Sequence, residues 1–241
     1  NSVLEVWKVL TPVKLSDVPP HLRGKMLRCW EMLTTKTDVH RSAKSRILID
    51  GSQEELTQFG PGQFYSGVVS YADLKISLFC LLASGGHLRF IDVETAFLQS
   101  DRENDERVFC HIPDTYKRDH PEFSQYAWEV TGSLYGRRCS PKRWRDTLKG
   151  WLVSEEFRVN MFDDSLFVRE CMKDGRLILI IVYVDDLTIG FWSHENSSEI
   201  LVRDFEAKLT KRFKCKPGDS LKPGIPIRLL GMQLQMSEKI E

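Results

Sequence analysis

The segment Leu177–Gly190 constrains the fold of this chain more than any other stretch, and it reads LILIIVYVDDLTIG. Eight apolar or aromatic residues lead into Asp185 and Asp186, and a second apolar run follows at once. This pattern predicts a buried hairpin with two carboxylates at its tip. Aspartate is a common turn residue, but tight hairpins favour Asn-Gly or Asp-Gly. Two like charges beside an apolar core are costly unless a cation lies between them, so the pattern indicates a divalent metal ion.

The bulk composition is typical of a globular protein that does not cross a membrane. The chain has 241 residues, enough to bury a core as one large domain or two small ones. Its longest apolar run is the eight residues above, far short of the roughly 20 that a transmembrane helix needs. The N-terminus lacks the pattern of a signal peptide. It also lacks a starting Met, so we expect a piece of a longer chain.

Cysteine spacing and charge distribution limit the partners. The six cysteines form no C-x-x-C pair, so we expect neither a zinc site nor a disulfide framework, but reduced thiols in an intracellular protein. Formal net charge is zero, yet Lys and Arg cluster within 23–46, 137–149 and 208–222. Such patches can hold a polyanion, although each alone is also typical of a solvated face.

Periodicity and turn residues predict a mixed set of elements. Strands are predicted at Lys44–Asp50, in HLRFIDVETAF, in DSLFVRECM and in the final IRLLGMQLQM, with a turn at Lys173–Arg176. Helices are predicted in ADLKISLFCLLASGG, in CSPKRWRDTLKGWLVSEEF with Ser140 as N-cap and Pro141 at the first position, and in SSEILVRDFEAKLTKRF. From Leu88 onward the order resembles a split βαβ unit, an α+β fold whose antiparallel sheet carries helices on one face. That order permits Asp92 and the hairpin tip to be neighbours.

Three aspartates then form the candidate site. Asp92, Asp185 and Asp186 at neighbouring strand ends are what a two-metal site for nucleotidyl transfer needs. Mg²⁺ takes oxygen ligands of this kind. The aspartates alone are weak evidence among 34 acidic residues, and a single Asp92 is also typical of a strand-end cap.

The sequence motifs around these aspartates resemble those of a known family. IDVETAFLQSD is similar to M-D-V-K-T-A-F-L-N-G, GSLYGRRCSPKRW to K-S-L-Y-G-L-K-Q-S-P-R-Q-W, and YVDDLTIG to Y-V-D-D followed by a hydrophobic residue. RLLGMQL is similar to F-L-G-I-E-V, and AKSRILIDGSQ to Y-K-A-R-L-V-A-K-G-Y-S-Q. All five blocks come from the reverse transcriptase of copia-type long-terminal-repeat retrotransposons. They occur in family order over roughly Val9–Met236, so the chain resembles the reverse transcriptase domain of that Pol polyprotein.

The resemblance implies an RNA-directed DNA polymerase that transfers nucleotides to a primer 3′-hydroxyl with two Mg²⁺ or Mn²⁺ ions. Asp92 and Asp185 would hold both ions, with Asp186 in support and the Val93 carbonyl completing the coordination. Phe97 would lie beneath the sugar as a steric gate against ribonucleotides, although simple core packing is the alternative. The other implied nucleotide-binding residues are Arg46, Lys36, Glu94, Thr95, Ala96, Tyr135 and Gly136. Primer and template would be contacted by Tyr183, Ser140, Pro141, Leu230, Gly231 and Met232.

The same resemblance implies the domain organisation and partners. Residues 1–87 would be fingers-like, 88–236 the palm with the primer grip, and 237–241 the truncated start of a thumb or connection. Partners would be a primed RNA or DNA template, deoxynucleoside triphosphates, and the integrase and RNase H parts of the polyprotein, with no membrane. The expected location is intracellular, in cytoplasmic virus-like particles and the nucleus.

Departures from the family keep two alternatives open. Leu33 stands where the family carries a lysine, for which Lys36 would substitute, and Arg137-Arg138-Cys139 replaces Leu-Lys-Gln. The chain could therefore be an inactive retroelement relic, or a module that binds single strands by stacking bases on the aromatics of a split βαβ sheet. Against the binding module, the central strands show no exposed aromatic pair at alternating spacing, only Tyr183. Against the relic, an inert copy should lose its carboxylates, and all three are present.

Overall fold

The computed structural model describes residues 8–35, 43–54, 62, 64, 66–101, 107–170, 177–192 and 197–236. The chain divides into two compact units, each built from two stretches of sequence. Unit 1 comprises Asn1–Ser66 and Ala96–Leu148, and unit 2 comprises Gly67–Thr95 and Lys149–Glu241. Within the described residues, no helix combines the length and the apolar composition that crossing a membrane requires.

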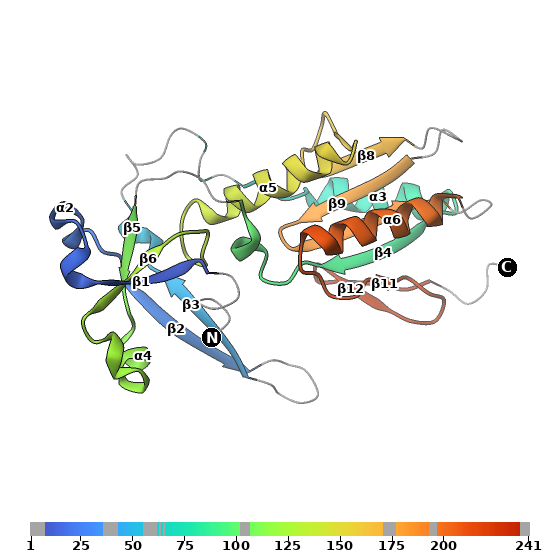
Figure 1. The fold of residues 1–241 in the computed structure, drawn as a ribbon. Coiled ribbons are helices and arrows are strands. Elements are labelled where there is room, and N and C mark those ends of the chain that lie inside the picture. Colours follow the sequence, from blue (N-terminus) through green and yellow to red (C-terminus); the bar gives the residue numbers. More distant parts are fainter. Residues whose placement is uncertain are drawn as a thin grey trace. The chain divides into compact units, whose positions relative to one another are not determined.

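Unit 1 contains two antiparallel sheets and short helices (Figure 1). A three-stranded sheet has the order β1-β6-β5, and β2 pairs with β3 in a two-stranded ribbon. The strands are β1 (Leu10–Lys14), β2 (Cys29–Thr35), β3 (Ala43–Ile49), β5 (Val108–His111) and β6 (Tyr126–Val130). The helical elements are η1 (Leu15–Asp17), α2 (Pro20–Arg23), η2 (Gly51–Gln53), η4 (Ala96–Gln99), α4 (Asp114–Asp119), η5 (Pro121–Phe123) and the first part of α5 (Ser140–Ser154).

One core lies between the two sheets of unit 1. Trp128 on β6 is fully buried, and Ile47 and Ile49 of β3 belong to the same cluster as Leu10 and Leu134. The predicted strand at Lys44–Asp50 is thereby confirmed as β3. The prolines of segment 1–30 predict an irregular chain, but β1 forms there as an edge strand against β6. An edge position tolerates Pro12 because one side of the strand needs no hydrogen bonds.

Unit 2 is built on a six-stranded sheet in which every pairing is antiparallel, with the order β11-β4-β10-β9-β8-β7. The predicted α+β class with an antiparallel sheet is confirmed. Its strands are β4 (His87–Asp92), β7 (Arg158–Val159), β8 (Leu166–Glu170), β9 (Leu177–Tyr183), β10 (Asp186–Phe191) and β11 (Asp219–Ser220). The helices are α3 (Tyr71–Ala83), the end of α5, and α6 (Ser197–Arg212). The predicted turn at Lys173–Arg176 lies outside the described residues.

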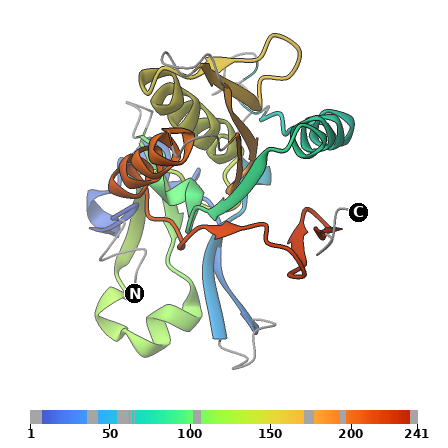
Figure 2. The ribbon, with the colours of Figure 1, turned by 90° about the vertical axis from the view of Figure 1, so that its right-hand side faces the viewer.

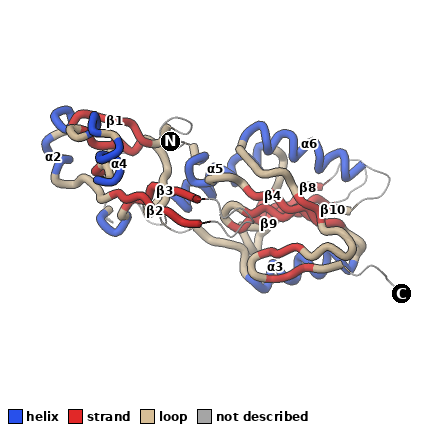
Figure 3. The backbone as a smooth tube through the Cα atoms, turned by 90° about the horizontal axis from the view of Figure 1, so that it is seen from below, coloured by secondary structure: helices blue, strands red, loops and turns tan. Residues whose placement is uncertain are grey.

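The prediction that helices cover one face of the sheet is wrong. The end of α5 and α6 lie on one face, and α3 lies on the other (Figures 2 and 3). On the first face Trp151 packs against Phe205 and Phe213. On the second, a Cβ at Gly190 would lie 2.8 Å from Leu81 Cδ2, so the glycine lets α3 approach β10 closely. An all-apolar strand such as β9 needs cover on both faces, which explains its unbroken hydrophobic run.

The end of the described chain also differs from the prediction. IRLLGMQLQM was expected to form one strand, but it forms β12 (Ile227–Leu229) and β13 (Met232–Leu234), which pair with each other. Leu230 and Gly231 between them have φ of 48° and 80°. Two consecutive residues with positive φ make a two-residue hairpin turn, so the chain folds back on itself.

The compact units do not follow the boundaries 1–87 and 88–236 expected from the sequence. Helix α3 precedes residue 88, but its buried leucines share a core with Leu88 and Ile181 of the sheet. Residues 96–148 follow it, but β5 and β6 pair in unit 1 with β1. Pairing between distant segments, rather than position along the chain, therefore decides which unit a segment joins.

Candidate active site

The three predicted aspartates meet at one end of two neighbouring strands of unit 2. Asp92 is the last residue of β4, and Asp186, the first residue of β10, lies directly opposite it in the antiparallel register. Asp185 precedes Asp186 in the turn after β9, and its carbonyl accepts a hydrogen bond of 2.8 Å from the Val93 N–H. The predicted hairpin and its adjacency to Asp92 are confirmed.

The turn that presents these carboxylates is strained at Val184, not at the aspartates. β9 and β10 pair as far as Tyr183 and Asp186, which leaves Val184 and Asp185 as the two turn residues. Val184 has φ of 56°, a region that β-branched residues rarely occupy. The turn sequence contains no glycine, and Val184 adopts the positive φ instead. Strain of this kind persists where the surrounding structure over-determines the backbone.

Burial and charge both affect the protonation of the cluster. The pKa of Asp186 is raised from 3.8 to about 6, first by burial and then by the charges of Asp185 and Asp92, while Lys216 opposes the rise. The Lys216 ammonium forms an ion pair with the Asp92 carboxylate, and this bond raises the pKa of Lys216. One cation of the chain therefore lies at the cluster and neutralises part of its charge.

Lys216 reaches Asp92 because the segment after α6 pairs with the end of β4. The Lys216 N–H donates to the Asp92 carbonyl at 2.9 Å, and the Glu94 N–H donates to the Lys214 carbonyl at 2.9 Å. The Lys214 ammonium also lies 3.0 Å from the Glu94 carboxylate. Sequence reasoning placed Lys216 in a basic patch but did not connect it with Asp92, because nothing local in the sequence indicates this pairing.

The donor set suits a hard divalent cation in its chemistry. Carboxylate oxygens, with the Val93 carbonyl beside them, are the ligands that Mg²⁺ and Mn²⁺ prefer. Burial is the main cause of the raised pKa of Asp186, and the charges of Asp185 and Asp92 add to it, while Lys216 opposes the rise. Among the residues that the structure describes, however, no three His, Cys, Asp or Glu side chains are grouped as a ready ion cage. The side chains would have to turn inward, and Asp92 would have to release Lys216.

A cavity of about 260 Å³ opens beside the carboxylates in unit 2. Asp92, Asp186 and Lys216 line one part of it, and Leu229 and Leu230 line another. The β12–β13 hairpin therefore lies next to the aspartates, and its turn holds the predicted primer-contacting residues Leu230 and Gly231, with Met232 starting β13. Tyr183, the last residue of β9, is partly buried against the core that α3 covers.

Four of the predicted nucleotide-binding residues meet in unit 1. The Arg46 guanidinium of β3 lies 5.7 Å from the ring centroid of Tyr135, and the Phe97 and Tyr135 ring centroids are 5.4 Å apart. Gly136 follows Tyr135 with φ of 91°, and a Cβ there would lie 2.0 Å from the Ile49 carbonyl oxygen. Arg46 and Phe97, which are 89 and 38 residues before Tyr135 in the sequence, thus both contact its ring.

The remaining predicted residues lie elsewhere. Glu94 and Thr95 belong to unit 2, and Ala96 starts η4 in unit 1. Thr95 has φ of 51°, and its buried hydroxyl has no hydrogen-bond partner among the described residues. Ser140 and Pro141 form the first turn of α5, where the Ser140 hydroxyl bonds to Leu134. Lys36 lies outside the described residues.

The sheet of unit 2 offers little support for base stacking. Its central strands β9 and β10 carry helices on both faces, and most of their side chains are buried (Figure 3). A module that stacks single-stranded bases needs an open sheet face with exposed aromatics. In the part of the chain that the structure describes, β9 and β10 provide no such face.

Comparison with known proteins agrees with the carboxylate geometry. A family model for reverse transcriptase (RNA-dependent DNA polymerase) matches residues 14–233. The chain is 27% identical over 231 residues to the retrovirus-related Pol polyprotein from transposon RE2 of Arabidopsis thaliana, covering 92% of this chain and 15% of that protein. It is 23% identical over 208 residues to the corresponding polyprotein from transposon TNT 1-94 of Nicotiana tabacum, covering 84% and 14%.

A yeast relative, the putative transposon Ty5-1 protein YCL074W of Saccharomyces cerevisiae, is 33% identical over 127 residues, covering 52% of this chain and 37% of that protein. The chain thus spans 15% and 14% of the length of the two plant polyproteins. The family model, in contrast, covers nearly the whole chain. The protein therefore belongs to the reverse transcriptase (RNA-dependent DNA polymerase) family, and the copia-type resemblance of its sequence is confirmed.

Proposed function

We propose that the chain is the RNA-directed DNA polymerase domain of a retrotransposon polyprotein and adds deoxynucleotides to a primer 3′-hydroxyl. The observation that carries this proposal is the meeting of Asp92, Asp185 and Asp186 at one end of β4 and the β9–β10 hairpin. Family membership supports the reaction class, and the raised pKa of Asp186 supports a site made for positive charge.

In this proposal the aspartates bind two Mg²⁺ or Mn²⁺ ions. Asp92 and Asp185 hold both ions, the Val93 carbonyl completes the coordination, and Asp186 supports the cluster. When bound, such ions neutralise the triphosphate and polarise the attacking hydroxyl. Lys216 forms an ion pair with Asp92 and would have to give it up for this carboxylate to bind an ion.

Further nucleotide contacts belong to the residues that the family resemblance assigns. Arg46 contacts the phosphates through its planar fork, and the backbone of Val93 to Ala96, with Glu94 and Thr95, lines the triphosphate path. Tyr135 and Gly136 form the pocket wall. Phe97 excludes a ribose 2′-hydroxyl, a role supported by its contact with Tyr135. Lys36 adds a further phosphate contact.

Primer and template contact the hairpin and helix ends of the molecule. Leu230, Gly231 and Met232 grip the primer, as their place beside the carboxylate cavity supports. Tyr183 contacts the primer end, and Ser140 with Pro141 starts the helix behind the template. Unit 1 is then fingers-like and unit 2 palm-like, within a polyprotein that also carries integrase and RNase H. The enzyme acts inside the cell, in virus-like particles and in the nucleus.

Primer extension by single-residue variants tests this function. We expect the protein to extend a primer on RNA and on DNA templates with Mg²⁺ or Mn²⁺. The variants Asp92→Asn, Asp185→Asn and Asp186→Asn should abolish extension while the protein stays folded. Asp204→Asn, an exposed aspartate of α6, is the matched control and should extend normally. Extension by the three variants at the wild-type rate would show that these carboxylates are not the catalytic ones.

A further inference from the structure

Two segments of unit 1 meet backbone to backbone, the end of β3 and the loop before α5. Leu48 forms a parallel bridge with Tyr135, and the Ile49 N–H donates to the Tyr135 carbonyl at 2.9 Å. A Cβ on Gly51 would lie 2.1 Å from the Gly136 carbonyl oxygen. Because no side chain fits between the segments, any shift of the loop moves Tyr135 relative to β3.

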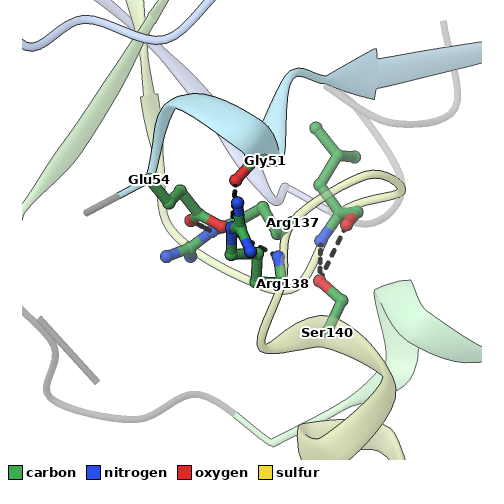
Figure 4. A network of polar contacts seen from close by, with 6 residues as sticks. Gly51, Glu54, Arg137, Arg138 and Ser140 are labelled. Carbon is green, nitrogen blue, oxygen red and sulfur yellow. Dashed lines mark hydrogen bonds and ion pairs between the residues drawn. The ribbon is translucent and has the colours of Figure 1, made fainter. Parts of the chain in front are cut away.

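A buried ion pair joins the same two segments (Figure 4). The Arg137 Nε donates to Glu54 Oε1 at 2.8 Å, and the two side chains are only 4% and 3% exposed. The second oxygen, Glu54 Oε2, accepts the Arg138 N–H at 2.8 Å, and the Arg138 guanidinium returns a bond of 2.5 Å to the Gly51 carbonyl. One carboxylate therefore holds two consecutive residues of the loop.

The far end of the loop is fixed as well. The Ser140 hydroxyl accepts from the Leu134 N–H at 3.0 Å and donates to the Leu134 carbonyl at 2.7 Å (Figure 4). Tyr135 and Gly136 thus lie between two anchors, the ion pair on one side and this serine on the other. Directional bonds at both ends leave the loop few alternative conformations.

Tyr135, which is held in this way, contacts two of the proposed nucleotide-binding residues. Arg46, three residues before Ile49 on β3, lies over the Tyr135 ring, and Phe97 packs against the same ring. The contact between Ile49 and Tyr135 therefore sets the position of the ring relative to Arg46. Neither Glu54 nor Arg137 reaches the surface, so neither can touch a substrate.

We propose that the Glu54–Arg137 ion pair is a positioning element of the nucleotide site. It fixes Tyr135 against β3 and so sets the affinity for the incoming deoxynucleotide, while the chemical step depends on the aspartates. This inference rests on the proposed function. A buried ion pair is a poor source of stability, because desolvation offsets its attraction and an apolar pair often serves as well. The two Glu54 oxygens, however, accept directional hydrogen bonds from Arg137 and Arg138, and an apolar pair provides no such bonds.

Two single variants and their combination test the role. Glu54→Gln and Arg137→Leu each leave one buried charge without its partner, so both should lower the unfolding temperature. Each should also raise KM for deoxynucleotides about ten-fold with kcat changed less than about two-fold, the pattern of lost nucleotide binding. Hydrogen exchange should show faster exchange of the Ile49 amide, which bonds to Tyr135.

The double variant Glu54→Gln/Arg137→Leu separates positioning from plain stabilisation. It contains no uncompensated charge, so its unfolding temperature should return toward that of wild type. KM should stay raised and the Ile49 amide should still exchange faster than in wild type, because the bond between residues 54 and 137 that holds the loop is lost. Recovery of KM together with stability would show that the pair only stabilises the fold and would overturn the proposal.

A matched control uses a second Arg–Glu pair among the described residues of unit 1. Arg107 binds Glu129 at 2.6 Å but is exposed, so Arg107→Gln should leave KM and the Ile49 amide unchanged. A similar effect of this variant would contradict a specific role for Glu54. If the wild-type protein extends no primer at all, the proposed function fails, whereas exchange at Ile49 still decides whether the ion pair holds the loop: unchanged exchange in Glu54→Gln overturns the inference.

Discussion

Lys216 forms an ion pair with Asp92 at the end of β4, at the point where three aspartates meet. Backbone pairing fixes this arrangement, because the Lys216 N–H also donates to the Asp92 carbonyl at 2.9 Å. The pKa of Asp186 is nevertheless raised to about 6, first by burial and then by the charges of Asp185 and Asp92, against the opposing charge of Lys216. Lys216 is therefore a tethered cation that would compete with a metal ion for Asp92.

Removing that cation should strengthen metal binding. In Lys216→Gln, the positive charge beside the carboxylates disappears and Asp92 is left without its ion-pair partner. We expect Mn²⁺ to bind several-fold more tightly, since a like charge no longer repels it, as measured by Mn²⁺ titration followed by electron paramagnetic resonance. Lys208→Gln, which breaks an ion pair with Glu155 just after α5, is the control. Weaker Mn²⁺ binding in Lys216→Gln would instead make the lysine a supporting group.

The raised pKa of Asp186 predicts a pH-dependent stability in the absence of metal. An acid with a higher pKa in the folded state binds more protons when folded, so the free energy of unfolding falls as pH rises from about 4 to about 6. In chelator, Asp186→Asn should therefore unfold at a higher temperature than wild type at pH 7, and the difference should shrink toward pH 4. Thermal unfolding across this pH range measures it. A variant less stable than wild type at pH 7 would contradict the predicted cost of the charge.

Phe97 tests the selection of sugars. If its ring excludes a ribose 2′-hydroxyl, Phe97→Val should raise the ratio of ribonucleotide to deoxynucleotide incorporation, because removing bulk relieves a clash without adding a contact. The measurement is that ratio in single-nucleotide extension, with Phe162→Ala, an exposed phenylalanine of unit 2, as the control. An unchanged ratio with a lower unfolding temperature would assign Phe97 to core packing.

Gly190 tests the packing of α3 on the sheet. A side chain at this position of β10 meets Leu81 at 2.8 Å, so Gly190→Val should destabilise the protein by about 1–3 kcal/mol through overpacking. Adding Leu81→Ala should recover part of the loss, because the two changes share one space. Denaturant unfolding of the single and double variants measures this coupling. Strictly additive effects would show that α3 does not press on β10.

Local patterns determined much of this protein. The unbroken apolar run before Asp185 predicts a buried hairpin, and α3 ends at Ala83 before Gly85, whose φ of 76° ends the helix as its sequence predicts. These features depend on periodicity and turn chemistry within a few residues, which the sequence displays directly. Even the adjacency of Asp92 to the hairpin was permitted by the strand order.

Only the tertiary structure decided which distant segments meet. The sequence shows Lys216 only as one member of a basic patch. The structure shows that backbone pairing brings it into contact with Asp92. Arg137 departs from the family pattern, and the sequence alone gives no reason for it. The structure shows that its buried partner is Glu54, more than 80 residues earlier. Helix α3 joined the opposite face of the sheet because β9 and β10 need apolar cover on both sides. Long-range contacts of this kind follow from the packing of the whole chain, and no local pattern encodes them.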